Sequence, residues 1–378
     1  MVRTPALLAW ALHVLLVPFY VLPSGLPQPS DLLVLVVVPL AMLGWNGRLA
    51  IRSVRIVRVL TWFTLWVTVV NLGWAAVLGK WSEPKDYLIF PFFYIFDLGI
   101  FVAVLILFER YREVFIRITL YAVFAAVLFQ VAASYVMPGS QLRGSLFFNN
   151  PNQLGYYVLL AATLVALTQR RVGLSMITAS IALTGCAYLA LISASRAAVG
   201  GIAMLLCLLL ISNVRVIILA CIAAFALVNA GGPIDHAIEA SKQRAMQGPN
   251  PNRGDFLEER GYDRMWDYKE YMVLGAGEGD NVRFTTDPRK AHELHSSFAT
   301  VLFSYGIPGA VMFVMLVFGI LRGASARGAV MLAPTTVYMF AHQGLRFTFF
   351  WVILAIFVEL QDPKRLPTMR ARNAPAPG

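Results

Sequence analysis

Residues 88–108, LIFPFFYIFDLGIFVAVLILF, set the class of fold, because their one charged side chain, Asp97, stands in a run long enough to cross a bilayer. Similar apolar runs recur along the 378-residue chain, in which 58% of residues are hydrophobic and 13% are charged. Soluble domains contain about 25% charged residues. In lipid each spanning segment must satisfy its own backbone hydrogen bonds, and these runs lack the polar–apolar alternation of a barrel strand. The sequence therefore predicts an all-α polytopic membrane protein.

About twelve transmembrane helices are expected. The first run follows Arg3 and lacks a small-residue cleavage site, so we interpret it as an uncleaved first span and not as a signal peptide. The runs at 31–45, 329–341 and 347–360 are short, and we expect these segments to be tilted, broken or extended by their neighbours. The predicted segments are residues 5–22, 31–45, 59–79, 88–108, 118–137, 153–168, 172–192, 197–212, 214–231, 297–320, 329–341 and 347–360.

Basic residues set the predicted orientation. They concentrate in alternate connections, as in Arg48, Arg52, Arg55 and Arg58 before the third segment, which the positive-inside rule assigns to the cytoplasm. Both termini are then cytoplasmic, and we expect the protein in the inner membrane of a bacterium. The net charge of +11 reflects these clusters between spans, so we predict no nucleic-acid partner.

The longest polar segment, residues 232–296, divides the chain and contains most of its Asp and Glu residues. Most connections between helices are short, so a loop of this length is expected to cover a site on the extracytoplasmic face. The predicted organisation is a bundle of about nine helices at 1–231, the large extracytoplasmic loop with short helices at 232–296, a bundle of about three helices at 297–360, and a disordered cytoplasmic tail at 361–378.

Two connections predicted on the outer face carry arginine beside helix-start residues. Arg196 follows Ser195 and either snorkels to the interface or forms an anion site, since a guanidinium matches phosphate oxygens in a fixed fork. The N–H groups at the start of the next helix would add to anion binding. Arg143 precedes Asn150 and Asn152, which fit either a turn in which Asn152 caps the next helix or a second phosphate-binding position.

Within the loop, residues 255–273 predict a helix capped by Asp255. Arg260 and Arg264 lie near the aromatic residues Trp266 and Tyr268, so the helix is either an ordinary surface helix or a cationic, aromatic wall suited to a sugar phosphate. The glycine-rich run at 274–279 ends this helix and does not fit a nucleotide-binding fingerprint, because no strand precedes it. The acidic residues of the loop alternate with basic ones, and we interpret them as solvated.

The loop re-enters the membrane at Glu293-Leu294-His295-Ser296-Ser297. His295 is suited to accept a proton near neutral pH. Ser296 or Ser297 is expected to cap the following helix. A serine hydrolase is not indicated, since the chain has no nucleophile elbow.

His342 and Arg346 form a second polar pair at the outer end of a predicted span, and titratable groups at membrane depth are commonly functional. The sequence contains no metal-binding motif, and we predict no cofactor. Cys186, Cys207 and Cys221 lie inside apolar runs and are expected to be buried small hydrophobic residues without a disulfide.

Several short motifs in this order resemble the bacterial O-antigen ligase and O-antigen (exopolysaccharide) polymerase family. The resemblance covers about residues 140 to 352, and the order and spacing of the motifs carry it more than any one motif. The motifs are Arg143-Gly144 with Phe148, Asn150-Pro151-Asn152 and Gly155; Ser195-Arg196-Ala197-Ala198; Arg260-Gly261-Tyr262-Asp263-Arg264 with Leu274-Gly275-Ala276-Gly277-Glu278; Glu293-Leu294-His295-Ser296-Ser297-Phe298 running into Tyr305-Gly306-Ile307-Pro308-Gly309; and His342, Gly344, Leu345, Arg346, Phe347 and Trp351.

The resemblance implies a glycosyltransferase fold of the GT-C type with an outward-facing site and metal-independent transfer from a glycan on undecaprenyl diphosphate. By resemblance, Arg196 and the loop arginines would hold the diphosphate, and His295 would act near the acceptor hydroxyl. Many ligases carry arginine four residues before the loop tryptophan, where this chain has Tyr262, so Arg260 or Arg264 would take that role. The expected catalytic residues are His295, Arg196 and Arg264. The expected substrate-binding residues are Arg143, Asn150, Asn152, Ser195, Arg260, Glu293, His342 and Arg346.

The expected function is polymerisation of undecaprenyl-diphosphate-linked repeat units into O-antigen or exopolysaccharide. Ligation of a glycan to a lipid or protein acceptor is the alternative, and a transporter of lipid-linked sugar is a further one. A transporter would usually show internal repeats, and no convincing repeat is present. A structural component without catalysis is the remaining alternative. Expected partners are the lipid-linked donor, the glycan or lipid acceptor, membrane lipids, a chain-length regulator and a flippase.

Overall fold

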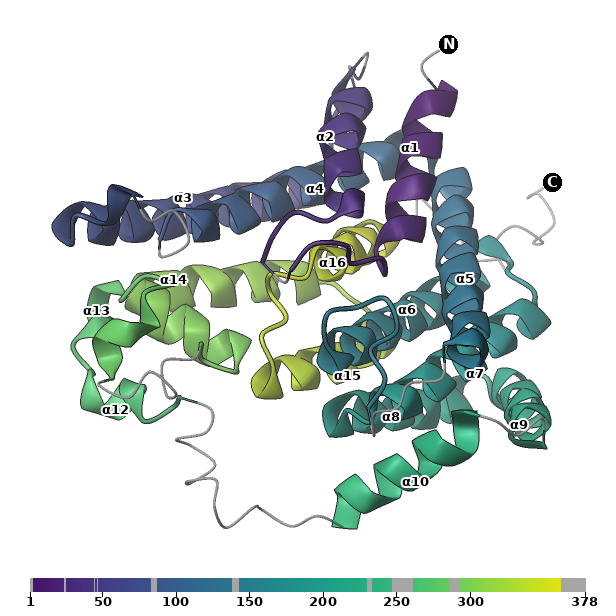
Figure 1. The fold of residues 1–378 in the computed structure, drawn as a ribbon. Helices are drawn as coiled ribbons and strands as arrows, with labels where there is room; N and C mark the ends of the chain where they lie inside the picture. The colour runs from purple at the N-terminus through teal and green to yellow at the C-terminus, as the bar shows by residue number, and fades with distance from the viewer. Residues whose placement is uncertain are drawn as a thin grey trace.

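The computed structural model describes residues 3–23, 25–43, 45, 47–82, 87–137, 143–229, 233–246, 261–285 and 293–361, and Figure 1 shows their arrangement. Every regular element in these ranges is a helix. The helices are α1 (Arg3–Leu16), α2 (Pro29–Met42), α3 (Ile51–Val77), η1 (Lys80–Ser82), α4 (Ile89–Tyr111), α5 (Glu113–Val136), α6 (Pro151–Val172), α7 (Met176–Ser193), α8 (Arg196–Ser212), α9 (Val214–Asn229), α10 (Pro233–Met246), α12 (Arg264–Asp267), α13 (Tyr271–Leu274), η2 (Asn281–Phe284), α14 (Ser297–Leu321), α15 (Ala326–Ala341) and α16 (Thr348–Leu360).

The predicted spans correspond to helices. Each predicted segment overlaps one of α1 to α9 or α14 to α16. Five of these helices, α3, α4, α5, α7 and α14, are long and apolar enough to cross a membrane. The helices α1, α2, α8, α9 and α16 are apolar and shorter. The all-α prediction is confirmed for the described residues, and the apolar helices indicate a multi-pass membrane protein.

The outer surface of the bundle is also apolar. Trp62, Phe92 and Phe318 are exposed on long apolar helices, where a soluble protein would place polar residues. The predicted burial of all three cysteines is wrong, because only Cys186 is buried and Cys207 and Cys221 are exposed. Small apolar side chains on an outward helix face would contact lipid, so exposure in this position does not require polarity.

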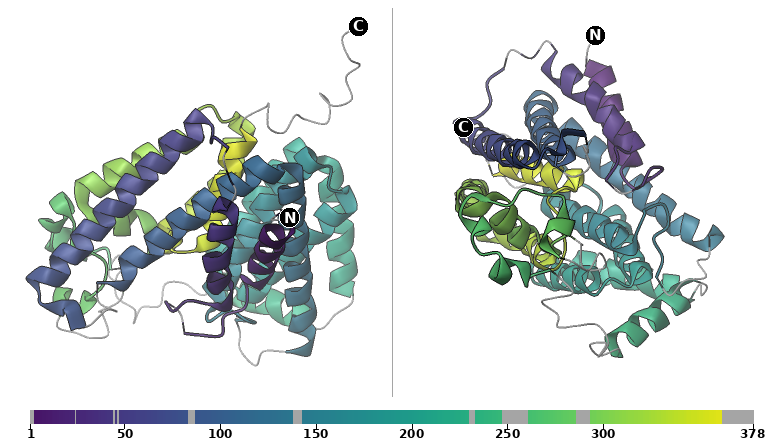
Figure 2. Two further views of the ribbon diagram at one scale, coloured as in Figure 1. Left: turned by 90° about the horizontal axis from the view of Figure 1, so that it is seen from above. Right: turned by 60° about the vertical axis from the view of Figure 1, so that its left-hand side comes forward.

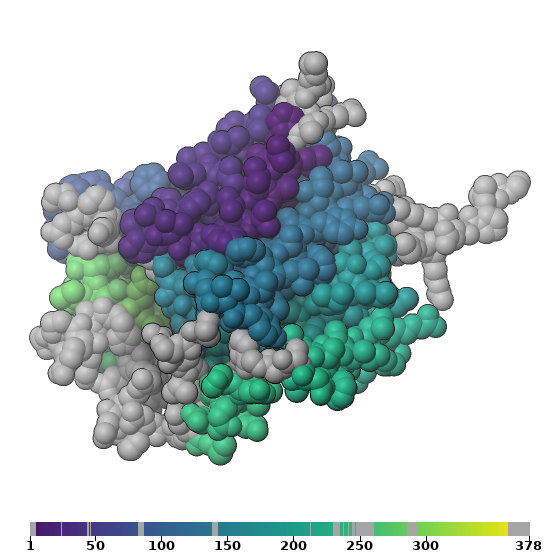
Figure 3. Space-filling view, turned by 45° about the vertical axis from the view of Figure 1, so that its right-hand side comes forward, coloured from purple at the N-terminus to yellow at the C-terminus, as the bar shows by residue number. Residues whose placement is uncertain are grey.

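Helix α16 lies at the centre of the bundle. Every residue from Phe349 to Leu360 is buried, and all of them except Glu359 are apolar, as is typical of a helix that is buried on all sides. It packs against α4, α6 and α14. Helix α3 runs along α14, as Figure 2 shows. The N-terminal helices α1 and α2 pack on α5 and α4 and form a continuous surface with them in Figure 3.

Helix α14 is broken in the middle, and the break prepares the candidate site. Gly306 has φ +64° and ψ −168°, outside the helical range, and Pro308 follows it. Proline has no N–H, so the carbonyl of Ser304, four residues earlier, loses its helical donor. The N–H of Gly277 donates to this carbonyl at 2.8 Å, and the N–H of Ala276 donates to the carbonyl of Phe303 at 2.9 Å. The glycine-rich segment of the loop thus docks on the carbonyls that the break exposes.

Two glycines make this docking sterically feasible. Gly275 has φ +104°, and a Cβ there would lie 2.6 Å from the Cα of Tyr305. A Cβ on Gly306 would lie 2.6 Å from the carbonyl oxygen of Val273. Neither position has room for a side chain, so the two backbones approach each other through paired glycines.

Two local predictions are corrected by the structure. Asn150, not Asn152, caps α6, because its side-chain oxygen accepts the N–H of Gln153 at 3.0 Å while Pro151 occupies the first helical position. The predicted helix at 255–273 is not continuous in its described part, where turns at 268–270 separate α12 from α13. Asp255 and Arg260 lie outside the described residues. Of the two serines predicted as a cap for α14, Ser296 takes the role, and its hydroxyl accepts the N–H of Ala299.

Candidate active site at one end of the helix bundle

The first part of the site joins the starts of α6 and α8. Arg143 donates from Nη2 to the side-chain oxygen of Asn152 at 2.7 Å and from Nε to the carbonyl of Ser193 at 3.2 Å. The hydroxyl of Tyr338, on α15, donates to the carbonyl of Asn152 at 2.9 Å. Arg143 therefore ties together the N-terminal end of α6 and the C-terminal end of α7, from which the chain turns into α8.

The turn between α7 and α8 exposes a helix N-terminus. Ala194 adopts a left-handed conformation with φ +45°, which lets the chain reverse between the two helices. Arg196 is the first residue of α8 and is exposed. The Ser195 side chain is buried, with 2% of its surface exposed, and its hydroxyl has no hydrogen-bond partner among the described residues. A positive helix end, a guanidinium and a buried hydroxyl at one place favour an anion.

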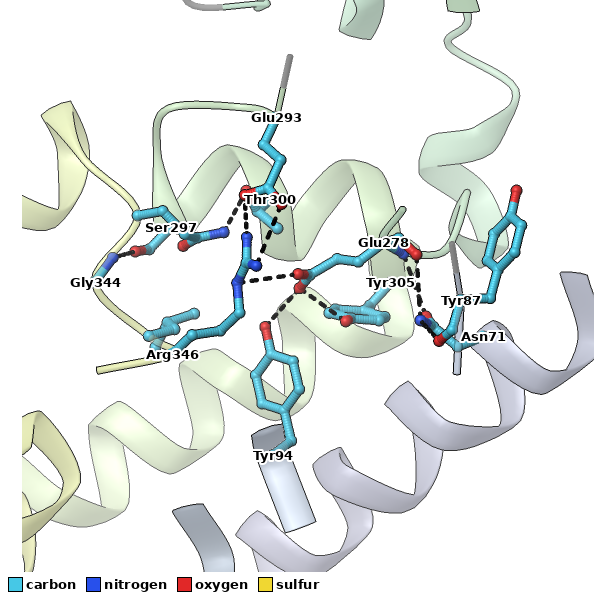
Figure 4. A network of polar contacts seen from close by, with 12 residues as sticks. Asn71, Tyr87, Tyr94, Glu278, Glu293, Ser297, Thr300, Tyr305, Gly344 and Arg346 are labelled. Carbon is cyan, nitrogen blue, oxygen red and sulfur yellow. Dashed lines mark hydrogen bonds and ion pairs between the residues drawn. The ribbon is translucent and has the colours of Figure 1, made fainter. Parts of the chain in front are cut away.

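A second group of contacts links this end of α15 to the start of α14. The rings of Tyr338 and His342 lie 4.7 Å apart, centre to centre. The Ser297 hydroxyl donates to the carbonyl of His342 at 3.3 Å and accepts the N–H of Gly344 at 2.8 Å. Figure 4 shows the Ser297–Gly344 contact beside Arg346. The connection between α15 and α16 is thereby held against the point where the loop re-enters the bundle.

Arg346 is the centre of the second group. It donates through both terminal nitrogens to the two carboxylate oxygens of Glu293, and its Nε lies 3.4 Å from Oε2 of Glu278 (Figure 4). The guanidinium also lies over the ring of Phe90, 5.1 Å from its centre. Bidentate pairing and a neighbouring ring fix the orientation of the guanidinium. Arg346 is therefore an internal tie between three segments and not an open phosphate ligand.

Glu278 is held by hydrogen bonds to both its side chain and its backbone. Its Oε1 accepts hydrogen bonds from the hydroxyls of Tyr94 at 2.6 Å and Tyr305 at 2.8 Å. The side chain of Asn71, on α3, accepts its backbone N–H at 3.2 Å and donates to its carbonyl at 3.3 Å (Figure 4). Only 4% of the Glu278 side chain is exposed. The prediction that the acidic residues of the loop are solvated is wrong for Glu278, because the loop folds inward at the break in α14.

The electrostatics follow from this geometry. Burial raises the pKa of the Glu278 carboxyl, against the attraction of Arg346 and the tyrosine hydrogen bonds. The positive charge of Arg346 lowers the pKa of Glu293, which is more exposed. Burial alone would lower the pKa of Arg346, but the charges of Glu293 and Glu278 outweigh it and raise the pKa. The two carboxylates that pair with Arg346 are thus shifted in opposite directions.

The described loop arginines are also held by the protein. Arg264 is buried and donates to the side chain of Asn281 at 3.0 Å. It lines a cavity of about 20 Å³ together with Glu278, Glu293 and Arg346, a space for about one water molecule. Arg283 donates to the carbonyl of Ala276 and stacks on aromatic rings, with 4.3 Å to the Phe284 centre and 5.0 Å to that of Trp74.

His295 lies between Glu293 and Ser296, where the loop re-enters the bundle. It is exposed, and its charge acts on the carboxylate of Glu293 two residues before it. It directly precedes Ser296, the cap of α14. This position suits a group that exchanges a proton with a bound molecule.

The structure connects the two groups of predicted residues through Tyr338. Asn152 and Arg143 lie on one side of this tyrosine, and His342 leads to Arg346 on the other. Arg260 is outside the described residues, and Asn150 is used in capping α6. Sequence reasoning assigned no site role to Asn71, Tyr94, Glu278 or Tyr305, although Glu278 and Tyr305 stand in the motifs that carry the resemblance. A polar asparagine and a tyrosine inside apolar runs were the available signals, but neither identifies its partner.

No group of three or more His, Cys, Asp or Glu side chains that could hold a metal ion occurs within the described ranges. Comparison of the chain with models of known protein families and with curated protein sequences found no match.

Proposed function

We propose that the chain is a membrane glycosyltransferase of the GT-C type, with about twelve spans, that joins glycan units carried on undecaprenyl diphosphate. Its proposed place is the inner membrane of a bacterium, with both termini in the cytoplasm and the site on the outer face. The proposal rests on the resemblance of residues 140 to 352 to the O-antigen ligase and polymerase family. It is supported by the anion-binding character of the α7–α8 turn.

The observation that carries the proposal is that two arginines lie at the turn between α7 and α8. Arg143 donates to the carbonyl of Ser193, the last residue of α7, and Arg196 is the first residue of α8. Guanidinium groups bind phosphate oxygens at any physiological pH. A diphosphate placed at the start of α8 would also meet the N–H groups of the first turn and the buried Ser195 hydroxyl.

The proposed reaction is a displacement at the anomeric carbon of the donor sugar. The acceptor hydroxyl oxygen bonds to this carbon while the bond from the carbon to the diphosphate oxygen breaks, and the electron pair leaves with the diphosphate. His295 takes the proton of the acceptor hydroxyl. Arg196 and Arg143 stabilise the negative charge that develops on the leaving diphosphate.

The ion-pair cluster has a positioning role in this proposal. Arg346 and Glu293 hold the segment that carries His295 against the connection between α15 and α16. Proton transfer requires the base within hydrogen-bond reach of the acceptor hydroxyl. The cluster would therefore set the distance between His295 and the start of α8.

Polymerisation of repeat units is the first candidate, and ligation to a lipid or protein acceptor is the second. Both use the same donor and differ only in the acceptor. The product identifies the reaction, because polymerisation gives a ladder of repeat lengths and ligation gives one modified acceptor. A transporter would return the lipid-linked donor chemically unchanged.

The test uses the full chain in lipid nanodiscs with an undecaprenyl-diphosphate oligosaccharide and EDTA. We expect release of undecaprenyl diphosphate and growth of the glycan, read by mass spectrometry. We expect Arg196→Ala and His295→Ala each to lower the rate by about 10²-fold or more. Arg322→Ala and His236→Ala, which change exposed residues outside the site, are the matched controls and should retain the rate.

Two results would overturn the proposal. One is intact donor after incubation with folded wild-type protein and acceptor. The other is full activity of both the Arg196 and the His295 variants. A strict requirement for added Mg²⁺ or Mn²⁺ would refute the arginine-based step and leave the glycosyltransferase class standing.

A further inference from the structure

A large cavity lies at the end of the bundle opposite the candidate active site. Its volume is about 1060 Å³, and it is formed where α6 ends, α7 begins, α8 turns into α9, α15 begins and α16 ends. The candidate site uses the other ends of α6, α7, α8, α15 and α16. Since α6 has 22 residues, the two sites are separated by about 33 Å along its axis.

The wall of this cavity combines arginine with apolar side chains. Arg170, Arg171, Arg215 and Arg327 line it, and none of its described lining residues is acidic. Arg170 and Arg327 are near enough for their charges to repel each other. Among the described residues, Arg215 and Arg327 have no hydrogen-bond or ion-pair partner. Like charges that converge on one cavity favour an anionic occupant.

The apolar part of the wall is extensive and exposed. Ile211 is 87% exposed, Leu210 and Val214 are each 49% exposed, and Met176 is 43% exposed. These residues lie in the same cavity wall as the arginines. A small soluble anion would pair with the guanidinium groups but would not contact the apolar part of the wall. An amphiphile with an anionic head and acyl chains would cover both parts.

We propose that this cavity binds an anionic diacyl phospholipid, with its phosphate among Arg215, Arg327, Arg170 and Arg171 and its acyl chains against the α8–α9 turn. Basic pockets between the ends of transmembrane helices are suited to anionic lipid head groups. A lipid in this place would hold together the ends of α6, α9 and α15. The proposal does not depend on the proposed enzymatic function.

The C-terminal segment is a poor alternative occupant on grounds of charge. Residues 362–378 follow Gln361, which lines the cavity, but they contain Lys364, Arg365, Arg370 and Arg372 and only one acid, Asp362. A basic peptide would be repelled by the arginines of the wall.

The test measures lipid retention by native mass spectrometry of the full chain in detergent. The protein is incubated with equal concentrations of dioleoyl-phosphatidylglycerol and dioleoyl-phosphatidylcholine. We expect wild type to retain phosphatidylglycerol in preference, and Arg215→Gln/Arg327→Gln to lose roughly thirtyfold of that preference, since each basic residue near a lipid surface contributes about a factor of five. The matched control is Arg55→Gln/Arg58→Gln, which removes the same charge from exposed positions on α3 outside the cavity.

The Arg215→Lys/Arg327→Lys variant should keep most of the preference, because it keeps the charge. Equal loss in the cavity and control variants would overturn the proposal, since net charge alone would then explain binding. Unchanged retention in the cavity variant would also overturn it. Displacement of phosphatidylglycerol by millimolar inorganic phosphate would assign the cavity to a soluble anion instead.

Discussion

The Nε atom of Arg346 lies 3.4 Å from Oε2 of Glu278, and this pair joins the connection between α15 and α16 to the glycine-rich segment that follows α13. Glu293 binds the other edge of the same guanidinium. Two segments of the loop and the connection before α16 are therefore positioned by one side chain. The following predictions test the contacts that hold these segments together.

Arg346→Met should destabilise the protein strongly. Removing one member of a buried ion pair leaves its partner charged and unpaired, at a cost of about 3–5 kcal/mol. Arg322→Met, at an exposed position after α14, is the matched control and should change stability by less than about 0.5 kcal/mol. Thermal unfolding in detergent measures the difference, and equal melting temperatures for the two variants would contradict the assigned role of Arg346.

The loss of stability in Arg346→Met, relative to wild type, should become smaller as the pH falls. Burial raises the pKa of Glu278 above its value in the unfolded chain, so the folded state takes up a proton more readily than the unfolded state. The penalty of the buried charge is fully present above the folded pKa of Glu278 and is lost as the pH falls through this pKa towards the unfolded value. In the wild type, Glu293 affects the pH dependence of stability in the opposite direction. Arg346 lowers the pKa of Glu293 below its unfolded value, so the stabilisation from this carboxylate is lost in acid.

We expect the melting temperature of Arg346→Met to lie closer to that of wild type at pH 5 than at pH 8. The double variant Arg346→Met/Glu278→Gln should recover part of the loss at pH 8, since it has no buried carboxylate to neutralise. A deficit that is the same at both pH values, without recovery in the double variant, would show that packing and not charge causes the loss.

Gly275→Ala should prevent docking of the loop on α14. Gly275 has φ +104°, and a methyl group there would lie 2.6 Å from the Cα of Tyr305. Gly323 also has a left-handed φ of +76°, but a methyl group there would meet no atom of the described residues within 4 Å, so Gly323→Ala is the matched control. The control should cost about 1–2 kcal/mol for conformation alone. Gly275→Ala should lower the melting temperature well beyond the control, and equal melting temperatures would contradict the steric argument.

Trp66→Phe should weaken the hold of α3 on the broken part of α14. The Nε1 of Trp66 donates to the carbonyl of Tyr305 at 2.7 Å, and phenylalanine cannot replace this donor. An unsatisfied buried carbonyl costs about 1–3 kcal/mol. Trp62, one turn earlier on α3, is exposed, so Trp62→Phe should leave the melting temperature nearly unchanged. If Trp66→Phe left the melting temperature unchanged, this hydrogen bond would not contribute measurably to the stability of the fold.

The caps of the helices show which contacts local sequence can predict. The sequence predicts a serine cap for α14, and the Ser296 hydroxyl fills that role, because a cap bonds to an N–H only three residues away. At α6 the sequence offers several asparagines, and the prediction of Asn152 as the cap is wrong. Asn150 caps the helix, and Asn152 is instead held by Arg143, which local sequence does not reveal.

Local sequence accounts for the helical class, the positions of the apolar helices and the end of the loop helix at the glycine-rich run. These features depend on the length of apolar runs and on the backbone of glycine and proline, which act over a few neighbouring residues. The burial of Glu278 and its pairing with Arg346, Tyr94 and Tyr305 arise only from tertiary packing. A carboxylate in a polar loop has the same local sequence whether it is solvated or buried. Its partners are selected when the loop packs against the exposed carbonyls of α14, because this packing brings together residues from α4, α14 and the connection before α16.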